Sequence, residues 1–245
     1  MDNIKGLIFD YGGTIDTDGV HWSEVLWLAY QKEEIPVTKS DFLDAYVYAE
    51  RQLATNPVIL PTDNFLAVLR AKTDLQTRYL VENGLWQTDE LIRRPDSEHM
   101  ALDCYACVLS VLRTNREVIR RLSGKYPLAL VSNFYGNIHN VLADFRLDCF
   151  RHVIESSVVG VRKPNPEIFT LGVNALGLKP EEVAVVGDSY TKDIIPAHQI
   201  GCTTVWLQGT PWARENPLPE HPECADVVIH SLRELTTGFA RVKSE

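Results

Sequence analysis

The sequence lacks long apolar runs and has little positive charge. No apolar run approaches the roughly 20 residues that a helix needs to span a bilayer, so a membrane-spanning protein is excluded. The 24 Lys and Arg residues are outnumbered by 33 Asp and Glu residues, and the net charge is −9. Nucleic-acid binding needs a basic surface that neutralises phosphates, so nucleic acid is not an expected partner. Any phosphate that this protein binds must be held locally, by a few cationic groups, backbone amides or a metal ion.

Cysteine is also scarce, and it is present in an odd number. The five cysteines of a 245-residue chain indicate reduced thiols in a cytosolic protein, because a chain of this size does not need disulfides. Cys104 and Cys107 form a C-x-x-C pair, but no second pair follows, and we expect both to be packing residues of a helix. Met1 leads directly into an apolar strand without a signal-peptide pattern. We therefore predict a soluble, cytoplasmic protein, and the sequence predicts no oligomeric state.

Short apolar runs predict the strands of a sheet. Runs of this length, closed by glycine or polar residues, are typical of strands that are buried on both faces of a parallel sheet. They cover residues 6–9, 128–131, 183–186, 203–207 and 227–229, with a more mixed candidate at 153–159. Amphipathic stretches at 115–122 and 166–176 lie between them and predict crossover helices. The alternation predicts an α/β fold with a doubly wound, mostly parallel sheet.

Residues 17–110 do not follow this alternation. Thr38 and Asp41 have the spacing of a capping box at a helix start. The segment has four helical patterns and no convincing strand, at 21–34, 39–54, 63–83 and 98–112, with Pro57, Pro61 and Pro95 expected between helices. We therefore predict a helical cap of residues 17–110, inserted into an α/β core of residues 1–16 and 111–245.

Polar residues follow the predicted strands at the points where the apolar runs end. In an open α/β sheet, ligands bind beyond the carboxyl ends of the strands, so these residues are expected to lie together. They are Asp10 after the first run, Ser132 and Asn133 after the second, Lys163 after the mixed run, Asp188 after the run at 183–186, and Asp193 five residues further on.

This set of side chains indicates phosphoryl transfer. Carboxylates near one point repel each other unless a cation lies among them, and Mg²⁺ prefers such oxygen ligands. Lys163 adds a second positive charge, and Ser132 can donate a hydrogen bond to a phosphoryl group. The sequence therefore predicts a magnesium-dependent enzyme that acts on a phosphorylated small molecule.

Four stretches in order carry a family resemblance. FDYGGT (9–14), LVSNF (130–134), VRKPNPEIF (161–169) and VVGDSYTKD (185–193) resemble the motifs of haloacid dehalogenase-like hydrolases. The helical insert is similar to the small cap that this family places between its first and second motifs. The resemblance implies a Rossmann-like core and an aspartyl-phosphate intermediate on Asp10.

The resemblance also implies roles for the other motif residues. Ser132 would contact the transferring group, and Lys163 would steady the nucleophile and the phosphoryl charge. The implied magnesium ligands are Asp10, the main-chain oxygen of Gly12, Asp188 and Asp193, the last acting directly or through Lys163. The further candidates for binding the phosphoryl group are Gly13, Thr14 and Asn133.

Gly12 departs from the family pattern. Most phosphatases of the family carry a second aspartate at this position, which protonates the leaving oxygen and then deprotonates water. A positioned acid or base contributes a factor of about 10²–10⁴ in rate. The substrate could have a good leaving group, such as an acyl or aryl phosphate, or another residue could supply the proton, with Asp16, Asp18 and His21 as candidates. The alternative is a binding or regulatory protein with weak or lost phosphatase activity.

Two other chemistries of the family fit less well. Dehalogenases carry a tyrosine at the position of Gly12, and Tyr11 is one residue too early. Phosphonate hydrolysis needs a cap lysine that forms a Schiff base, for which Lys32, Lys39 and Lys72 are the candidates.

Overall fold

The computed structural model describes the chain except residues 1–2, 57, 215–222 and 237–245. Its centre is a six-stranded sheet in the order β3-β2-β1-β4-β5-β6, and every neighbouring pair is parallel. The predicted α/β class and doubly wound sheet are confirmed. The strands are β1 (Gly6–Phe9), β2 (Leu128–Ser132), β3 (His152–Glu155), β4 (Val183–Gly187), β5 (Thr203–Leu207) and β6 (Val227–Ile229). The mixed run at 153–159 divides into the end of β3 and a short helix, α6 (Ser156–Val159).

Helices cover both faces of the sheet because successive side chains of a strand point in opposite directions. Leu7 and Phe9 of β1 join the apolar core on one face, and Ile8 joins the core on the other. Ile8 packs with α7 (Glu167–Leu176) and α8 (Ile195–Gln199). The first face packs against the C-terminal half of α4 (Glu90–Ser123), α5 (Ile138–Asp144) and the 3-10 helix η3 (Leu232–Thr236). Two further single-turn segments are η1 (Pro180–Glu182) and the π-helical η2 (Tyr190–Ile194).

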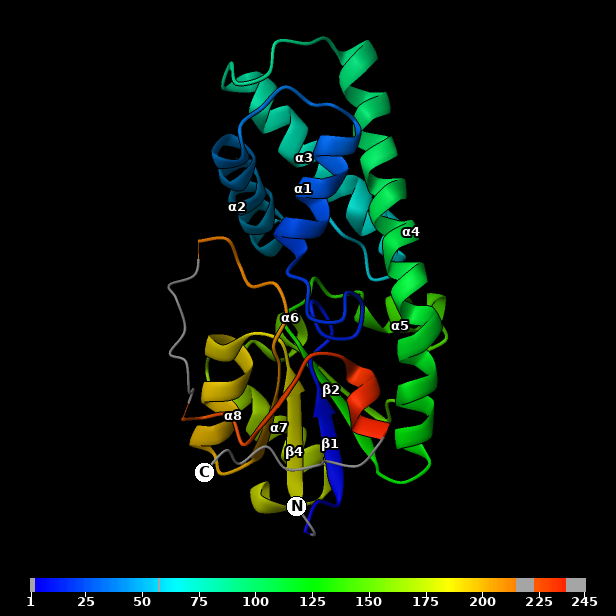
Figure 1. The fold of residues 1–245 in the computed structure, drawn as a ribbon, viewed down its shortest axis with the longest axis vertical. Helices are drawn as coiled ribbons and strands as arrows, with labels where there is room; N and C mark the ends of the chain where they lie inside the picture. The colour runs from blue at the N-terminus through cyan, green and yellow to red at the C-terminus, as the bar shows by residue number, and fades with distance from the viewer. Residues whose placement is uncertain (1–2, 57, 215–222, 237–245) are drawn as a thin grey trace.

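The predicted helical insert is present as a bundle at one end of the molecule. It contains α1 (Trp22–Lys32), α2 (Lys39–Thr55), α3 (Phe65–Glu82) and the first half of α4, all above the sheet in Figure 1. Thr38 and Asp41 form the predicted capping box at the start of α2. None of the helices in the described part of the chain has the length and apolar character needed to cross a bilayer.

Helix α4 differs from the sequence-based expectation. The helices predicted at 98–112 and 115–122 are one continuous helix of 34 residues, which runs beside both the bundle and the sheet. The boundary that we placed at residue 110 therefore has no break in secondary structure, and the division into cap and core stays a prediction.

Two predictions about single residues of α4 were wrong. Pro95 was expected between helices but lies inside α4, close to its start, where a missing N–H removes one bond from a long helix. Cys104 is buried as expected, whereas Cys107 is exposed and does not pack. Pro61 does lie between α2 and α3, and Pro57 lies outside the described residues.

Candidate active site

The carboxyl ends of β1, β2 and β4 bring the first site residues to one edge of the sheet. Asp10 continues β1, and its N–H donates to the carbonyl of Val186 on β4 at 2.9 Å. Ser132 is the last residue of β2, the other neighbour of β1. Asp188 directly follows β4. The edge faces the helical bundle, with β1 in blue, β2 in green and β4 in yellow in Figure 1.

Lys163 lies between two of the carboxylates. Its Nζ is 2.5 Å from Oδ1 of Asp10 and 2.6 Å from Oδ1 of Asp193. All three side chains are buried, Lys163 with 4% exposure and Asp193 with 2%. The structure thus brings together residues that are 153 and 30 positions apart in the sequence, as the strand-end argument predicts.

Thr14 connects the first strand to the fourth. Its hydroxyl lies 3.0 Å from Oδ2 of Asp10 and 3.0 Å from Oδ1 of Asp188, and it accepts the N–H of Asp188 at 3.0 Å. A hydroxyl has one proton, so it donates to one of these two carboxylates at a time. These contacts make Thr14 a positioning residue for both carboxylates, while the predicted contact with phosphate stays a prediction.

Gly13 allows the first loop to approach Asp188 closely. Its φ is +96°, in the region that favours glycine, and a Cβ at this position would lie 2.3 Å from Oδ2 of Asp188. Gly12 has no such constraint, because a Cβ there would meet only the Trp22 ring, at 3.8 Å. A side chain is therefore sterically possible at position 12 and excluded at position 13.

The site has more negative than positive groups, because three carboxylates surround one ammonium group. Burial, together with the charges of Asp10 and Asp193, raises the pKa of Asp188 well above its ordinary value. Burial raises the pKa of Asp193 to about 6, although Lys163 opposes the shift. Burial alone would lower the pKa of Lys163, but Asp10 and Asp193 raise it above its ordinary value, so the lysine stays charged.

These three carboxylates have the arrangement of a cation site. Oxygens of Asp10, Asp188 and Asp193 all lie within 4.8 Å of one another. Lys163 compensates one of their negative charges, and a hard divalent cation with oxygen ligands would compensate the others. The donor set therefore fits Mg²⁺, and the main-chain oxygen of Gly12 stays a predicted further ligand.

Asn133 holds the lysine loop in place. Its side-chain amide accepts the N–H of Lys163 at 2.9 Å and donates to the carbonyl of Lys163 at 3.1 Å. Both ends of the amide are thus used on the backbone of Lys163, which makes Asn133 a positioning residue, and a contact with phosphate stays a prediction. Ser132 is buried beside it at 2% exposure, at the end of β2.

The comparisons with known proteins agree with this geometry. A family model described as haloacid dehalogenase-like hydrolase matches residues 4–201. The chain belongs to this family. Glyceraldehyde 3-phosphate phosphatase of Pyrococcus furiosus is 32% identical over 172 residues, which cover 65% of this hydrolase and 71% of that protein. Phosphoserine phosphatase of Thermus thermophilus is 37% identical over 87 residues, 35% of this chain and 32% of that protein.

Solved structures share the fold of this haloacid dehalogenase-like hydrolase. A dehalogenase with an intermediate complex has a TM-score of 0.63 at 17% identity, and the match covers 98% of this chain and 99% of that one. A predicted phosphoglycolate phosphatase from Haemophilus somnus has a TM-score of 0.52 at 17% identity, covering 97% and 98%. At these identities the likeness establishes the fold alone.

Of the three candidates for the missing acid in this hydrolase, Asp16 is the one whose carboxylate binds the turn directly after Asp10. It accepts the N–H of Gly13 at 2.7 Å and the indole N–H of Trp22 at 2.9 Å. Burial raises its pKa to about 7. Asp18 instead accepts the N–H of Leu232 and the hydroxyl of Ser231, so its carboxylate anchors η3.

His21, the third candidate, is the N-cap residue of α1. Its Nδ1 accepts the N–H of Ser23 at 3.1 Å. Burial and the charge of Lys192 lower the pKa of His21 to about 4, so the ring is neutral at neutral pH. The ring packs against Tyr46 and Trp212, and this contact indicates a structural role.

The cap lysines of this hydrolase differ in position. Lys32 and Lys39 are exposed and form ion pairs with Asp103 and Glu24. Lys72 is buried and pairs with Glu50. Burial alone would lower the pKa of Lys72, but Glu50 raises it above its ordinary value. A Schiff base needs a neutral amine, so this environment does not favour the one proposed for phosphonate hydrolysis.

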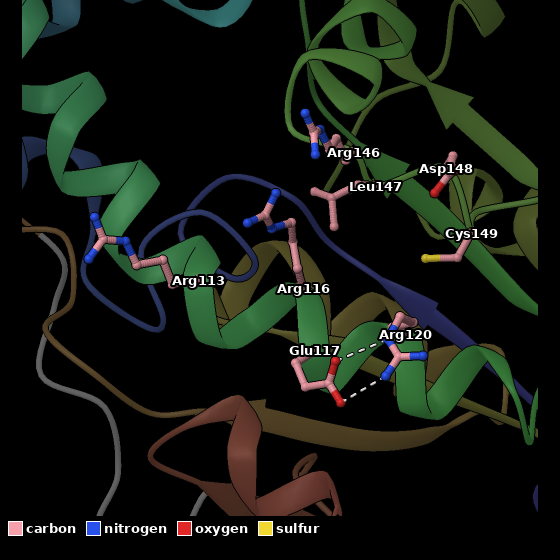
Figure 2. Close-up of a pocket in the computed structure, with 8 residues that line it drawn as sticks. All are labelled: Arg113, Arg116, Glu117, Arg120, Arg146, Leu147, Asp148 and Cys149. Atoms are coloured by element: carbon pink, nitrogen blue, oxygen red, sulfur yellow. Dashed lines mark hydrogen bonds and ion pairs between the residues drawn. The ribbon is translucent and has the colours of Figure 1, made fainter.

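A separate hollow of about 300 Å³ lies beside the second half of α4 and contains none of the predicted site residues. Figure 2 shows Arg120 paired with Glu117 across one turn of the helix, while Leu147 and Cys149 approach from the segment before β3. That segment leads into the amino end of β3, whereas Asp10 follows the carboxyl end of β1.

Proposed function

We propose that this hydrolase is a magnesium-dependent phosphatase of a small phosphorylated molecule, with Asp10 as the nucleophile. The observation that supports it is the contact of Lys163 with Asp10 and Asp193, beside Asp188, at the edge where ligands bind in such folds. When bound by Asp10, Asp188 and Asp193, Mg²⁺ supplies charge that neutralises and orients the phosphoryl oxygens.

The side chains of the chain itself account for the other requirements of phosphoryl transfer. A carboxylate oxygen of Asp10 attacks the phosphorus in line, the bond to the leaving oxygen breaks, and the phosphoryl group remains on Asp10. Lys163 holds Asp10 in one orientation and stabilises the negative charge of the transferring group. Ser132 donates a hydrogen bond to a phosphoryl oxygen. Water then hydrolyses the aspartyl phosphate and restores the carboxylate.

Asp16 supports a route for the proton that Gly12 cannot supply. Its Oδ2 accepts the indole N–H of Trp22, and that nitrogen lies 3.8 Å from where a Cβ of residue 12 would be. The carboxyl of Asp16 thus belongs to the same loop as the nucleophile and lies next to the space that the family aspartate fills. We assign the protonation of the leaving oxygen to Asp16.

Gly12 also supports a second candidate function, a binding or regulatory protein that retains the pocket and turns over slowly. The two functions differ in one measurement. Both predict that Mg²⁺ with beryllofluoride raises the melting temperature, but only the phosphatase releases phosphate at a useful rate.

The experiment is a phosphate-release screen with acyl, aryl and alkyl phosphates, with Mg²⁺ and with a chelator. We expect turnover by the wild type with Mg²⁺, and its loss in Asp10→Asn, which is nearly isosteric. Equal activity of both proteins, or equal inertness on every class of substrate, would overturn the proposed phosphatase.

A further inference from the structure

A buried ion pair lies in the cap, on the side that faces the catalytic loops. Nζ of Lys72, on α3, is 2.5 Å from Oε1 of Glu50, on α2. Long side chains on a helix point back toward its N-terminus. The N-terminus of α3 is Phe65, whose ring packs against Tyr11, the residue after the nucleophile. The ammonium group of Lys72 is therefore directed toward the core.

Residues of the catalytic loops surround this pair. The ring centroid of Tyr135 lies 5.7 Å from Nζ of Lys72, and its hydroxyl donates to Oε2 of Glu50 at 2.8 Å. Tyr135 belongs to the loop that begins with Ser132. The Trp22 ring lies 5.8 Å from the same Nζ, and its indole N–H donates to Asp16. The pair thus lies where the leaving group of a substrate on Asp10 would extend.

The pair is incompletely satisfied as a structural ion pair. Lys72 has 6% exposure, and among the described residues Glu50 is the only group within ion-pair distance of its three N–H donors. The rings of Trp22, Tyr46 and Tyr135, whose faces accept no conventional hydrogen bond, lie around the same Nζ. The Glu50 side chain is 32% exposed, yet its Oε1 is buried and accepts no hydrogen bond from the described part of the chain, so the carboxylate can accept a further donor. Buried ion pairs add little stability by themselves, so stability does not account for these two charges, and a ligand would.

The charges decide which ligand fits. A group with both a carboxylate and an ammonium can enter the pair with every charge matched, carboxylate to Lys72 and ammonium to Glu50. A purely anionic group would leave Glu50 without its partner, and a purely cationic group would do the same to Lys72. A buried charge without a partner costs much free energy. Replacing the one Lys72–Glu50 ion pair by two ion pairs to the ligand costs far less.

We propose that Lys72 and Glu50 bind the two charges of a zwitterionic leaving group, so that the preferred substrate is a phosphorylated amino acid. The inference rests on the proposed function, because it assumes that the phosphoryl group of the same substrate lies at Asp10. Tyr135 orients Glu50 through its hydroxyl, and the rings of Trp22 and Tyr46 exclude water around Lys72.

Four ligands that differ only in charge test the proposal. Phosphoserine carries both charges, 3-phosphooxypropionate only the carboxylate, phosphoethanolamine only the ammonium, and ethyl phosphate neither. Their dissociation constants are measured by calorimetry with Mg²⁺ in the Asp10→Asn protein, which avoids turnover. The same background receives Lys72→Met or Glu50→Gln, and Lys39→Met serves as the control because Lys39 is an exposed cap lysine.

We expect phosphoserine to bind most tightly. A hydrogen bond to a charged group predicts that Lys72→Met weakens the two carboxylate ligands about 10- to 100-fold and leaves ethyl phosphate unchanged. Glu50→Gln should weaken phosphoserine and phosphoethanolamine in the same way, and Lys39→Met should change nothing.

The inference is overturned if phosphoserine binds no more tightly than ethyl phosphate, if none of the four binds, or if each variant weakens all four equally. Its failure is distinguishable from that of the proposed function. Charge discrimination in binding without hydrolysis by the wild type would refute the phosphatase alone. Hydrolysis without charge discrimination would refute the zwitterion site alone.

Discussion

Restoring an acid at position 12 is the sharpest test of how this site works. Gly12→Asp places a carboxyl where most phosphatases of the family have one. The site has room for it, because the nearest atoms to the new Cβ belong to the Trp22 ring, at 3.8 and 3.9 Å. The backbone of Gly12 is outside the positive-φ region that Gly13 occupies, so an L side chain is not strained. The substitution should therefore leave the fold unchanged.

The size of the effect depends on the leaving group. A positioned acid or base contributes about 10²–10⁴ in rate, which is a barrier change of about 3–5 kcal/mol. An alkoxide needs a proton as it leaves, so alkyl phosphates should gain most of this factor. A phenolate or carboxylate leaves without one, so aryl and acyl phosphates should gain less than about tenfold. Because we assign this proton transfer to Asp16, the gain of Gly12→Asp on alkyl phosphates is smaller than the full factor, and Asp16→Asn should lower the rate of the wild type on alkyl phosphates.

The assay compares kcat on an alkyl phosphate and on acetyl phosphate for the wild type, Gly12→Asp and Gly12→Asn. The asparagine variant has nearly the same shape without the acid, so it separates proton transfer from packing. We expect the alkyl-to-acyl ratio of kcat to rise only in Gly12→Asp. An unchanged ratio, with both proteins binding Mg²⁺ and phosphate equally, would refute the view that the missing acid limits this enzyme.

Three further predictions concern glycine conformation, a partly buried histidine and a buried arginine. Gly13→Ala places a Cβ 2.3 Å from a carboxylate oxygen, so we expect loss of activity and of the Mg²⁺-dependent rise in melting temperature. Gly177→Ala, with φ of +67° and no atom within 4 Å, should cost about 1 kcal/mol of stability and no activity. Because His21 has a folded pKa of about 4 against 6.5 unfolded, the unfolded state binds more protons between these values. The contribution of His21 to stability should therefore fall by up to about 3 kcal/mol as pH drops from 7 to 4, and the difference between the wild type and His21→Asn, which keeps an N-cap acceptor, should isolate it in urea titrations. Arg93 is buried at 2% exposure between part-exposed carboxylates, so Arg93→Met should destabilise by about 2–3 kcal/mol, whereas the exposed Arg94→Met should change the unfolding midpoint little.

Much of the site could be predicted from the chain itself because strand ends are local features. Each short apolar run predicts a strand, and parallel strands all end at the same edge. The residues directly after the runs, such as Asp10 and Asp188, therefore lie along one edge, and these two meet because β1 and β4 are neighbours in the sheet. The contacts of Lys163 with Asp10 and Asp193 depend in addition on the loop after α6 and on η2, which carry Lys163 and Asp193 back to that edge.

The helical segment could be predicted only in outline. Its periodicity indicates that helices form, but amphipathic spacing does not say which neighbour a face will meet. Glu50 carries no signal in the sequence because one carboxylate on a helix is ordinary, and Tyr135 has none beyond following the second motif. The two polar patterns of α4 looked like two helices because neither pattern shows that the chain between them stays helical.

The sequence alone determined the class of fold, the edge at which we propose the chemistry and most of the charged groups there, because strand length, apolar runs and the residues after them are encoded over a few positions. Only the tertiary structure decided how these groups are used: that Thr14 joins two carboxylates, that Asn133 holds the backbone of Lys163, and that Lys72 meets Glu50 beside the catalytic loops. Such contacts depend on how helices and strands that are far apart in the chain are oriented against each other, and side-chain packing sets that orientation across the whole molecule.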